Sequence, residues 1–395
     1  MTHCSLLNEL CDLPTAPYAE EHVIAWLRDW AGRHRESIRS RQDAAGNLYL
    51  EYDGRPRGRI RSAKRPPLVL EAHMDHPGFL VEKQRRDGRI DALFRGGVKP
   101  SHFKDAQVRF WSAGEWVKSR VLTVKTLAGK RPLKVLLAAP EGRARLAPGA
   151  LGMWDLPDAA ARRGLFAARV CDDLAGVAAM IGALEELLIQ KVPAHVVALC
   201  SRAEEVGFAG VLAICEHGWI PRGSPVIGLE TSKASAGAPQ GGGPIIRVGD
   251  RTGIFSAGLT HFIAQAAGHL SDDDATFKYQ RKLMDGGMCN STAFAAYGYD
   301  AAGLCLALGN YHNMFDRAAV GPYAPFRAPV AKAGPGIASE TIHLGDFDGL
   351  VRLLVEVARR IGDYEPGLAV VRRRLAKMHR EEQRKLLYGT RKRNT

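Results

Sequence analysis

The chain has 395 residues, 46% of them apolar and 25% charged, an ordinary globular composition that excludes a disordered, collagen-like or disulfide-scaffold protein. At this length we expect two domains, or one domain with a large insertion. The 55 Lys and Arg residues outnumber the 42 Asp and Glu residues and give a net charge of +13. Such an excess can indicate a nucleic-acid or anionic-surface partner, so its position along the chain matters.

The N-terminal residues lack the basic stretch, apolar run and small-residue cleavage site of a signal peptide. No segment approaches the roughly 18 uncharged apolar residues of a membrane-spanning helix. We therefore expect a cytoplasmic protein with no membrane partner. The seven cysteines are odd in number and contain no Cys-x-x-Cys pair, which favours free, buried thiols in a reducing compartment.

The first 82 residues predict alternating helix and strand. A helix is expected over residues 18–34, where Val23, Trp26, Leu27 and Trp30 recur on one face. Strands are expected over residues 48–52 and 68–72. From about residue 83 to residue 163 the pattern changes to short strands and turns without a convincing helix, with strands expected over 108–110, 115–117, 121–124 and 135–137. This segment predicts a small inserted β-domain.

The α/β alternation returns at Val170. Helices are predicted over 174–188, 207–215 and 350–361, and strands over 196–199, 225–229 and 304–308. The pattern predicts an α/β fold in which helices flank an open sheet. We expect residues 1–82 and 164–366 to form one discontinuous catalytic α/β domain, residues 83–163 to form the inserted β-domain, and residues 367–395 to form a basic tail.

The charge excess lies mainly in that tail. Residues 372–395 contain ten basic and two acidic residues, a net charge of +8, so the rest of the chain carries only +5. Leu375, Met378 and Leu386 recur at loosely helical spacing, which predicts a solvated helix with a frayed end. A contact with an acidic subunit surface or with nucleic acid is the alternative. Nucleic acid is disfavoured as a partner of the whole chain.

Acidic and histidine residues follow the predicted strands, where an open α/β sheet places its ligands and catalytic groups. These residues are His73 and Asp75, the pair Asp172 and Asp173, the pair Glu204 and Glu205, Glu230, and His312. His73 can ligate a metal while a carboxylate two residues on orients its ring. In isolation, paired Asp residues at a helix start are more typical of a cap. In a hydrolytic site, adjacent Glu residues can divide metal binding and proton transfer.

Two histidines and three carboxylates suit a pair of borderline cations such as Zn²⁺ with one carboxylate bridging them. A water held between two such metals becomes a nucleophile near neutral pH. The residues therefore predict a hydrolytic dinuclear metal centre.

Four segments resemble the tetrahedral (TET-type) glutamyl-aminopeptidases, metallopeptidase family forty-two, within the dinuclear zinc exopeptidases. They are residues 71–79 (EAHMDHPGF), 171–176 (CDDLAG), 202–207 (RAEEVG) and 310–312 (NYH). The resemblance extends from the first helix to about Ile361. It implies a zinc-exopeptidase-like (phosphorylase/hydrolase-like) fold, with a mixed sheet flanked by helices and an inserted small β-domain for dimerisation or oligomerisation.

Residue by residue, the resemblance implies that Asp172 bridges two metals. It also implies that the remaining ligands are His73, Glu205, Glu230 and His312. Glu204 would be the general base that deprotonates the bridging water and later protonates the leaving amine. Asp75 would be hydrogen-bonded to His73. The cofactors would be two divalent ions per chain, with Zn²⁺ favoured and Co²⁺ or Mn²⁺ also suitable. The substrate would be a short peptide cleaved at its N-terminal bond, and the chain would form dimers or a twelve-subunit shell.

The sequence departs from the family pattern at five places without removing an implied ligand. His76-Pro77 replaces the usual Glu-Ile, Leu174 replaces a basic residue, and Glu230 replaces an Asp. The usual Gly-Gly-Thr-Asp-Ala becomes Gly286-Gly287-Met288-Cys289-Asn290-Ser291, and His312 is followed by Asn313-Met314. These changes leave the side-chain preference of the enzyme open.

Two alternative functions are compatible with the sequence. One is an amidohydrolase or deacylase of N-acyl amino acids on the same fold, but such relatives usually carry their extra domain after the acidic ligands. Here the β-rich segment precedes Asp172. The other is a non-catalytic binding protein that uses the basic surface, and the presence of Glu204 and a full ligand set argues against it.

Overall fold

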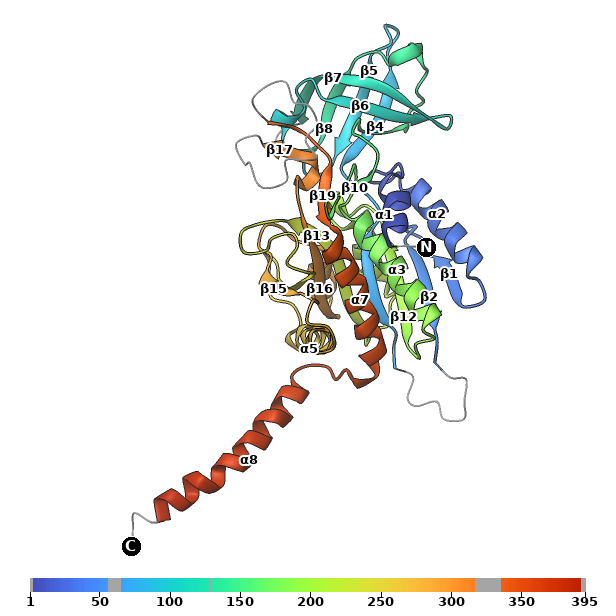
Figure 1. The fold of residues 1–395 in the computed structure, drawn as a ribbon. Coiled ribbons are helices and arrows are strands. Elements are labelled where there is room, and N and C mark those ends of the chain that lie inside the picture. Colours follow the sequence, from blue (N-terminus) through green and yellow to red (C-terminus); the bar gives the residue numbers. More distant parts are fainter. Residues whose placement is uncertain (1–2, 56–64, 128–129, 317–334, 392–395) are drawn as a thin grey trace.

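The computed structural model describes residues 3–55, 65–127, 130–316 and 335–391. It shows a central α/β body, a β-barrel beyond one end of that body, and a long C-terminal helix that projects from the other side (Figure 1).

An eight-stranded mixed sheet forms the centre of the body, in the order β1-β2-β12-β3-β13-β16-β14-β15. Its strands are β1 (Ile38–Gln42), β2 (Leu48–Asp53), β12 (His195–Ser201), β3 (Leu68–His73), β13 (Pro225–Lys233), β16 (Asp300–Leu308), β14 (Ile245–Gly249) and β15 (Gln280–Leu283). The four central strands β12, β3, β13 and β16 are parallel to one another. Their carboxyl ends therefore meet at one edge of the sheet, which is where an α/β protein binds its ligands.

Helices cover both faces of this sheet. On one face lie α1 (His3–Cys11), α2 (Glu21–Arg33), α3 (Leu174–Ile189), α5 (Ala257–Asp273) and α7 (Leu344–Arg360), and on the other lie α4 (Ala209–His217) and α6 (Asn290–Ala296). Strand β12 shows why: Val196, Ala198 and Cys200 belong to the core on the α3 side, whereas Val197 and Leu199 belong to the core on the α4 side. A strand buried on both faces has a continuous apolar sequence, and β12 has one.

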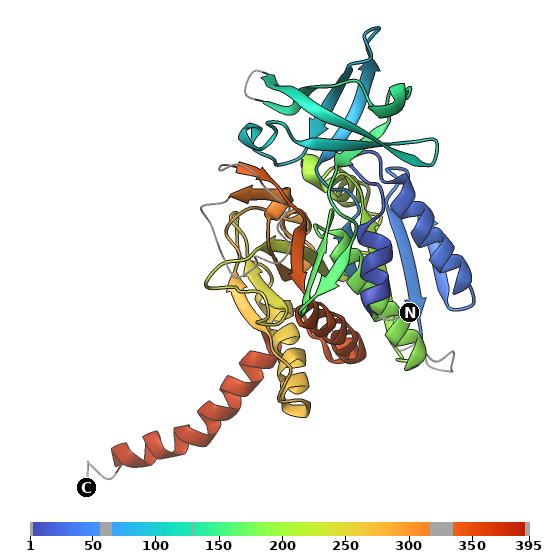
Figure 2. The same cartoon turned by 45° about the horizontal axis from the view of Figure 1, so that its top comes forward.

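A closed barrel, in the order β4-β5-β8-β7-β6-β9, lies between β3 and α3 in the sequence. Its strands are β4 (Gly78–Gln84), β5 (Ile90–Arg95), β6 (Gln107–Ser112), β7 (Glu115–Leu127), β8 (Lys130–Leu137) and β9 (Leu151–Trp154). Five aromatic side chains fill its interior in edge-on contacts: Phe79, Phe94, Phe103, Phe110 and Trp154. Because β3 leads directly into β4, the barrel lies beside the carboxyl ends of the central strands (Figure 2).

Two smaller sheets complete the body. One contains β10 (Ala160–Arg162), β11 (Leu165–Ala168) and β19 (Glu340–His343), and the other pairs β17 (Met314–Asp316) with β18 (Pro335–Ile337). Strand β11 returns the chain from the barrel to the start of α3. The barrel is thus connected to the body through two segments that both adjoin the carboxyl edge of the sheet.

The predicted fold class is confirmed: helices flank a mixed sheet, and a small β-barrel is inserted into the chain. One local prediction was wrong. The strand predicted over residues 225–229 extends to Lys233, so Glu230 lies inside β13 and not after it. The assignment of domain boundaries at residues 82, 163 and 366 stays a prediction.

The C-terminal helix α8 (Ala369–Arg391) extends away from the body in both views (Figures 1 and 2). Every side chain from Arg372 to Glu381 is exposed, including those of Leu375 and Met378. The end of the predicted tail, with Lys392 and Arg393, lies outside the described residues.

The seven cysteines are free, and six are buried while Cys4 is half-buried. Within the described ranges, no helix combines the length and the apolar character needed to cross a bilayer.

Candidate metal centre

His73 ends the buried strand β3 at the carboxyl edge of the sheet, and its ring is held by the turn that follows. Nδ1 lies 3.0 Å from the main-chain carbonyl oxygen of Asp75 and 3.5 Å from its carboxylate. The Asp75 carboxylate accepts hydrogen bonds from the backbone N–H groups of Glu204, at 2.9 Å, and Glu205, at 3.1 Å. The implied Asp75–His73 hydrogen bond is therefore made chiefly by the Asp75 carbonyl group, and the carboxylate braces the Glu204–Glu205 turn.

Asp172 lies between the two predicted histidine ligands. Its Oδ1 is 3.5 Å from His73 Nε2, and its Oδ2 is 3.5 Å from His312 Nε2. Its position is fixed through the main chain, because the N–H groups of Cys171 and Asp172 both donate to Glu340 Oε2, at 2.8 and 3.0 Å. One carboxylate thus presents a different oxygen to each imidazole.

Asp173 has the capping role typical of an Asp at a helix start. Its Oδ1 accepts from the backbone N–H of Gly176 at 3.2 Å, which satisfies a free donor in the first turn of α3. Leu174, a departure from the family pattern, is fully buried in the same turn. In this segment the Asp172 carboxylate therefore points toward the two histidines, and Asp173 caps the start of the helix.

His312 lies in a tight turn after β16, and its Nε2 is 2.9 Å from Glu205 Oε1. The Tyr311 ring stacks on the imidazole with centroids 3.7 Å apart. Asn310, His312 and Asn313 all have positive φ angles, between 54° and 61°. Non-glycine residues rarely adopt this conformation, and such residues cluster at ligand-holding sites.

Glu230 points from β13 toward His73, with Oε1 3.8 Å from His73 Nε2. The side chains form three groups whose ligand atoms lie within 4.8 Å of one another: His73 with Glu204 and Glu230; Asp172 with Glu205 and His312; and Asp172 with Asp173 and Glu230. All five predicted ligands and the predicted base Glu204 are therefore brought together.

The electrostatics of the cluster reflect many buried carboxylates. Burial raises the pKa of Glu204 well above its ordinary value, and Glu230 and Glu205 add to this effect. Burial and the charge of Asp172 also raise the pKa of Glu230. For Asp172, burial favours the neutral form, but the neighbouring His312 and His73 imidazoles outweigh this effect and lower the pKa below the usual range. The cluster concentrates carboxyl groups in a place shielded from water.

This donor set fits two divalent cations. Two imidazoles and several carboxylates are ligands that Zn²⁺ accepts. His312 is grouped with Glu205 and Asp172, and His73, which is grouped with Glu204 and Glu230, also lies 3.5 Å from Asp172 Oδ1. Asp172 Oδ1 is buried and has no hydrogen-bond partner. A buried carboxylate oxygen without a donor is costly, and a cation beside it would remove that cost.

Three residues near the ligands were not predicted to belong to the site. His76 Nδ1 lies 2.7 Å from the Asp172 carbonyl oxygen, and His76 Nε2 lies 2.9 Å from Asn313 Oδ1. Glu340 accepts from the Asp172 segment as described above. His76 and Asn313 adjoin predicted site residues in the sequence, but Glu340 has no such signal because it arrives from the distant strand β19.

The segment from Gly286 to Ser291, another departure from the family pattern, contacts the strand that carries His73. Met288 is half-exposed, and Asn290 is buried, with its Nδ2 donating at 2.7 Å to Glu71 Oε1, two residues before His73. Ser201 Oγ donates to the same oxygen at 2.6 Å. Asn290 therefore supports the strand that carries His73.

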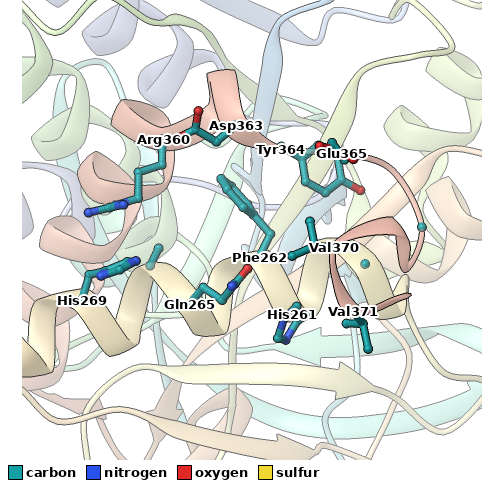
Figure 3. A pocket seen from close by; sticks show the side chains of 13 residues that line it. His261, Phe262, Gln265, His269, Arg360, Asp363, Tyr364, Glu365, Val370 and Val371 are labelled. Carbon is teal, nitrogen blue, oxygen red and sulfur yellow. The ribbon is translucent and has the colours of Figure 1, made fainter. Parts of the chain in front are cut away.

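A surface hollow of about 200 Å³ lies away from this cluster, between α5 and the segment that joins α7 to α8 (Figure 3). Phe262, Tyr364 and Val371 supply part of its lining, and His269 and Arg360 lie at one end. The predicted ligands lie at the carboxyl ends of the central strands, and none of them lines the hollow. We therefore assign the hollow no role in the metal centre.

Comparisons with known proteins agree with the geometry. Residues 143–321 match the family model described as M42 glutamyl aminopeptidase, a segment that contains Asp172, Glu204, Glu205, Glu230 and His312. Aminopeptidase APDkam598 from the archaeon Desulfurococcus kamchatkensis is similar over 93% of this chain and 98% of its own, with a TM-score of 0.71 and 17% identity. TET1 peptidase from Pyrococcus horikoshii is similar over 90% of this chain and 99% of its own, with a TM-score of 0.69 and 19% identity. At these identities the solved structures establish the fold.

Proposed function

We propose that this chain, whose residues 143–321 match the family model described as M42 glutamyl aminopeptidase, is a metallopeptidase that hydrolyses the N-terminal peptide bond of short peptides. The observation that carries this proposal is the position of Asp172, whose two oxygens face His73 and His312 at 3.5 Å each. A carboxylate between two imidazoles is the arrangement that a bridged pair of cations requires.

The proposal gives each cation its own protein ligands. His73 and Glu230 would hold one ion together with Oδ1 of Asp172, and His312 and Glu205 would hold the other together with Oδ2. Zn²⁺ is the favoured metal, and Co²⁺ and Mn²⁺ suit the same ligands. When bound, such ions polarise a peptide carbonyl group and make water a nucleophile near neutral pH.

Glu204 would supply the proton transfer. Its carboxylate is grouped with His73 and Glu230, so it lies beside the proposed site, where a carboxylate can accept a proton. It would take a proton from the attacking water and deliver it to the leaving amine. Asp75 would hold Glu204 and Glu205 in place through their N–H groups.

The oligomeric state is part of the proposal. The P. horikoshii TET1 peptidase can assemble into a tetrahedron or a large octahedral shell, and the related PhTET1-12s structure is a dodecamer. We extend assembly to this chain, with the barrel as the subunit contact and the cytoplasm as its compartment. Light scattering of the full chain distinguishes a dimer from a dodecamer by mass.

Metal analysis of the purified protein is the most direct test. We expect two divalent ions per chain by elemental analysis, and activity that is lost on chelation and regained with Zn²⁺, Co²⁺ or Mn²⁺. A full-length, folded protein that binds no divalent ion would contradict the proposal.

Replacement of the proposed base tests the mechanism. In Glu204→Gln we expect two ions to stay bound while hydrolysis falls about 100- to 10,000-fold, because the amide cannot accept the proton. The exposed barrel residue Glu141 offers a matched control, and Glu141→Gln should keep the wild-type rate. An unchanged rate in Glu204→Gln would remove Glu204 from the mechanism.

A substrate panel separates peptidase from deacylase activity. We expect cleavage of aminoacyl substrates with a free α-amine and no cleavage of N-acyl amino acids. Cleavage of acylated substrates alone would replace the aminopeptidase proposal with the deacylase alternative.

A further inference from the structure

His76 is buried beside the metal centre but is not among the grouped ligands. Its side chain is 1% exposed, and each ring nitrogen already has a partner. Nδ1 lies 2.7 Å from the carbonyl oxygen of Asp172. Because a carbonyl oxygen can only accept, Nδ1 must carry the hydrogen and donate it. Nε2 lies 2.9 Å from Asn313 Oδ1, an amide oxygen that also only accepts, so a hydrogen bond there requires Nε2 to donate as well. With both nitrogens engaged, the ring is not free to bind an ion.

The partners of His76 belong to the two other ligand segments. Asp172 is the carboxylate between the histidines, and Asn313 directly follows His312. Asn313 is itself fixed, since its Nδ2 donates to the Arg169 carbonyl oxygen at 2.9 Å. His76 follows His73 by three residues, so one imidazole joins the three chain segments that carry His73, Asp172 and His312.

The hydrogen bond from His76 is the second of two that restrain the main chain of Asp172. Glu340 accepts from the Asp172 N–H group at 3.0 Å, and His76 donates to the Asp172 carbonyl group. The backbone on each side of the ligand side chain is therefore held by a buried group. The direction of the Asp172 carboxylate, and with it the separation of its oxygens from His73 and His312, depends on these two hydrogen bonds.

We propose that His76 is a positioning residue for the metal centre, which acts by donating from Nδ1 to the Asp172 carbonyl group. This inference rests on the proposed function. The position is also one at which the sequence departs from the family pattern, and a glutamate there could not donate this hydrogen bond when ionised. Second-sphere groups of this kind typically change metal affinity 10- to 100-fold when they are removed.

Three substitutions isolate the contact. His76→Asn places an amide nitrogen near the Nδ1 position and keeps the donor to Asp172. His76→Gln reaches toward the Nε2 position and keeps only the contact with Asn313. His76→Leu removes both. We expect Zn²⁺ affinity of the metal-free full chain, measured by calorimetric titration, to stay within about threefold in His76→Asn and to fall about 10- to 100-fold in His76→Gln and His76→Leu.

The absorption spectrum of the Co²⁺-loaded protein provides a second readout that does not depend on activity. We expect His76→Gln to change the ligand-field bands, because Asp172 shifts relative to the ion, whereas His76→Asn should keep them. His195→Gln is a matched control: His195 lies 2.7 Å from Glu51 at the opposite end of β12, so both the affinity and the spectrum should be those of the wild type.

The outcomes distinguish the two proposals. If wild-type protein binds no Zn²⁺, the proposed function fails. If it binds two ions and His76→Leu binds them with equal affinity and an unchanged Co²⁺ spectrum, the positioning role of His76 fails and the proposed function stands. Should His76→Leu not fold, as judged by circular dichroism, the comparison of His76→Asn with His76→Gln decides, and equal affinities in these two would also overturn the inference.

Discussion

At the scale of single residues, the proposed ligands are positioned by hydrogen bonds to their main-chain groups as well as by contacts between their side chains. Asp75 accepts from the N–H groups of Glu204 and Glu205, and Glu340 accepts from those of Cys171 and Asp172. The Asp75 carboxylate is fixed in direction because each of its oxygens accepts from one backbone N–H group, whereas Glu340 accepts both of its backbone donors at Oε2. These two acids therefore determine where the ligand loops lie.

Asp75→Asn tests this role. An asparagine has one acceptor oxygen, so one of the two N–H groups would face an NH₂ group and lose its partner. We expect the Glu204–Glu205 turn to loosen, with Zn²⁺ affinity and hydrolysis both reduced about 10- to 100-fold. Calorimetric Zn²⁺ titration and the rate on an aminoacyl substrate measure the two effects.

Asp346 supplies the control for that experiment. It also accepts from two backbone N–H groups, those of Gly241 and Gly243, each at 2.8 Å, but it lies at the start of α7 among none of the grouped ligands. Asp346→Asn should lower the unfolding midpoint and leave Zn²⁺ affinity unchanged. If both variants keep the full affinity for Zn²⁺, the hydrogen bonds that Asp75 accepts from Glu204 and Glu205 have no part in metal binding.

The sequence predicted that the candidate site residues gather at one place, because metal chemistry restricts which side chains serve, and their roles as ligands and base stay predictions. His73, Asp172, Glu205, Glu230 and His312 all lie together. The groups that support them were not predictable to the same degree. Glu340 is an ordinary polar residue in the sequence, and only the pairing of β19 with β11 brings it to Asp172.

At the scale of elements, strand β13 and helix α6 approach each other closely at Gly228. A Cβ atom added there would lie 2.3 Å from Ser291 Oγ, and Ser291 is fully buried and donates to the Ala302 carbonyl oxygen. Neither the strand nor the helix has room to move without loss of core contacts. The glycine therefore sets the distance between the sheet and this helix.

Gly228→Ala should lower the free energy of unfolding by about 1–3 kcal/mol, the usual cost of overpacking a core. Urea unfolding of the full chain, followed by circular dichroism, measures this change. Gly268 in α5 is the matched control, because an added Cβ atom there meets nothing within 4 Å. Gly268→Ala should stabilise the protein by up to about 1 kcal/mol, since alanine is the better helix former. Equal effects in the two variants would mean that the Gly228 contact does not limit packing.

Helices and strands with a strong apolar pattern could be predicted from the sequence. Elements that are defined by pairing with distant segments could not. The predictions for α3, β12 and α7 follow from apolar side chains at helical or strand spacing. Strand β1 exposes four of its five residues, so its sequence has no burial pattern and only pairing with β2 defines it. The end of β13 was missed for a related reason: Glu230 and Lys233 are polar because that part of the strand leaves the core at the site.

At the scale of the whole molecule, the net charge and the candidate site are separated. Residues 372–395 carry +8 of the +13, and α8 projects from the body, whereas the proposed ligands lie at the carboxyl edge of the central sheet. Interactions between charges more than about 10 Å apart across solvent are largely screened at physiological salt. The tail therefore has little influence on the protonation of the site.

A chain that ends at Val371 tests this independence. We expect its Zn²⁺ affinity, rate of hydrolysis and unfolding midpoint to match those of the full chain, because the removed side chains from Arg372 to Glu381 are exposed. Among the described side chains, the body loses the ion pair of Arg373 with Glu365, which is exposed and worth little. Elution from a cation exchanger should move to lower salt. A loss of metal affinity would show that the tail contributes to the site.

The spread of the proposed ligands along the chain has a consequence for how the protein is made. His73 and His312 are separated by the entire barrel and by five of the sheet's strands. When His73 has left the ribosome, every other proposed ligand has still to be synthesised. The segments that carry these ligands are far apart in the sequence, and contacts between distant segments slow folding. A cation can therefore be captured only when synthesis is nearly complete. Metal loading should follow folding of the body, and a chain truncated before His312 should bind no pair of ions.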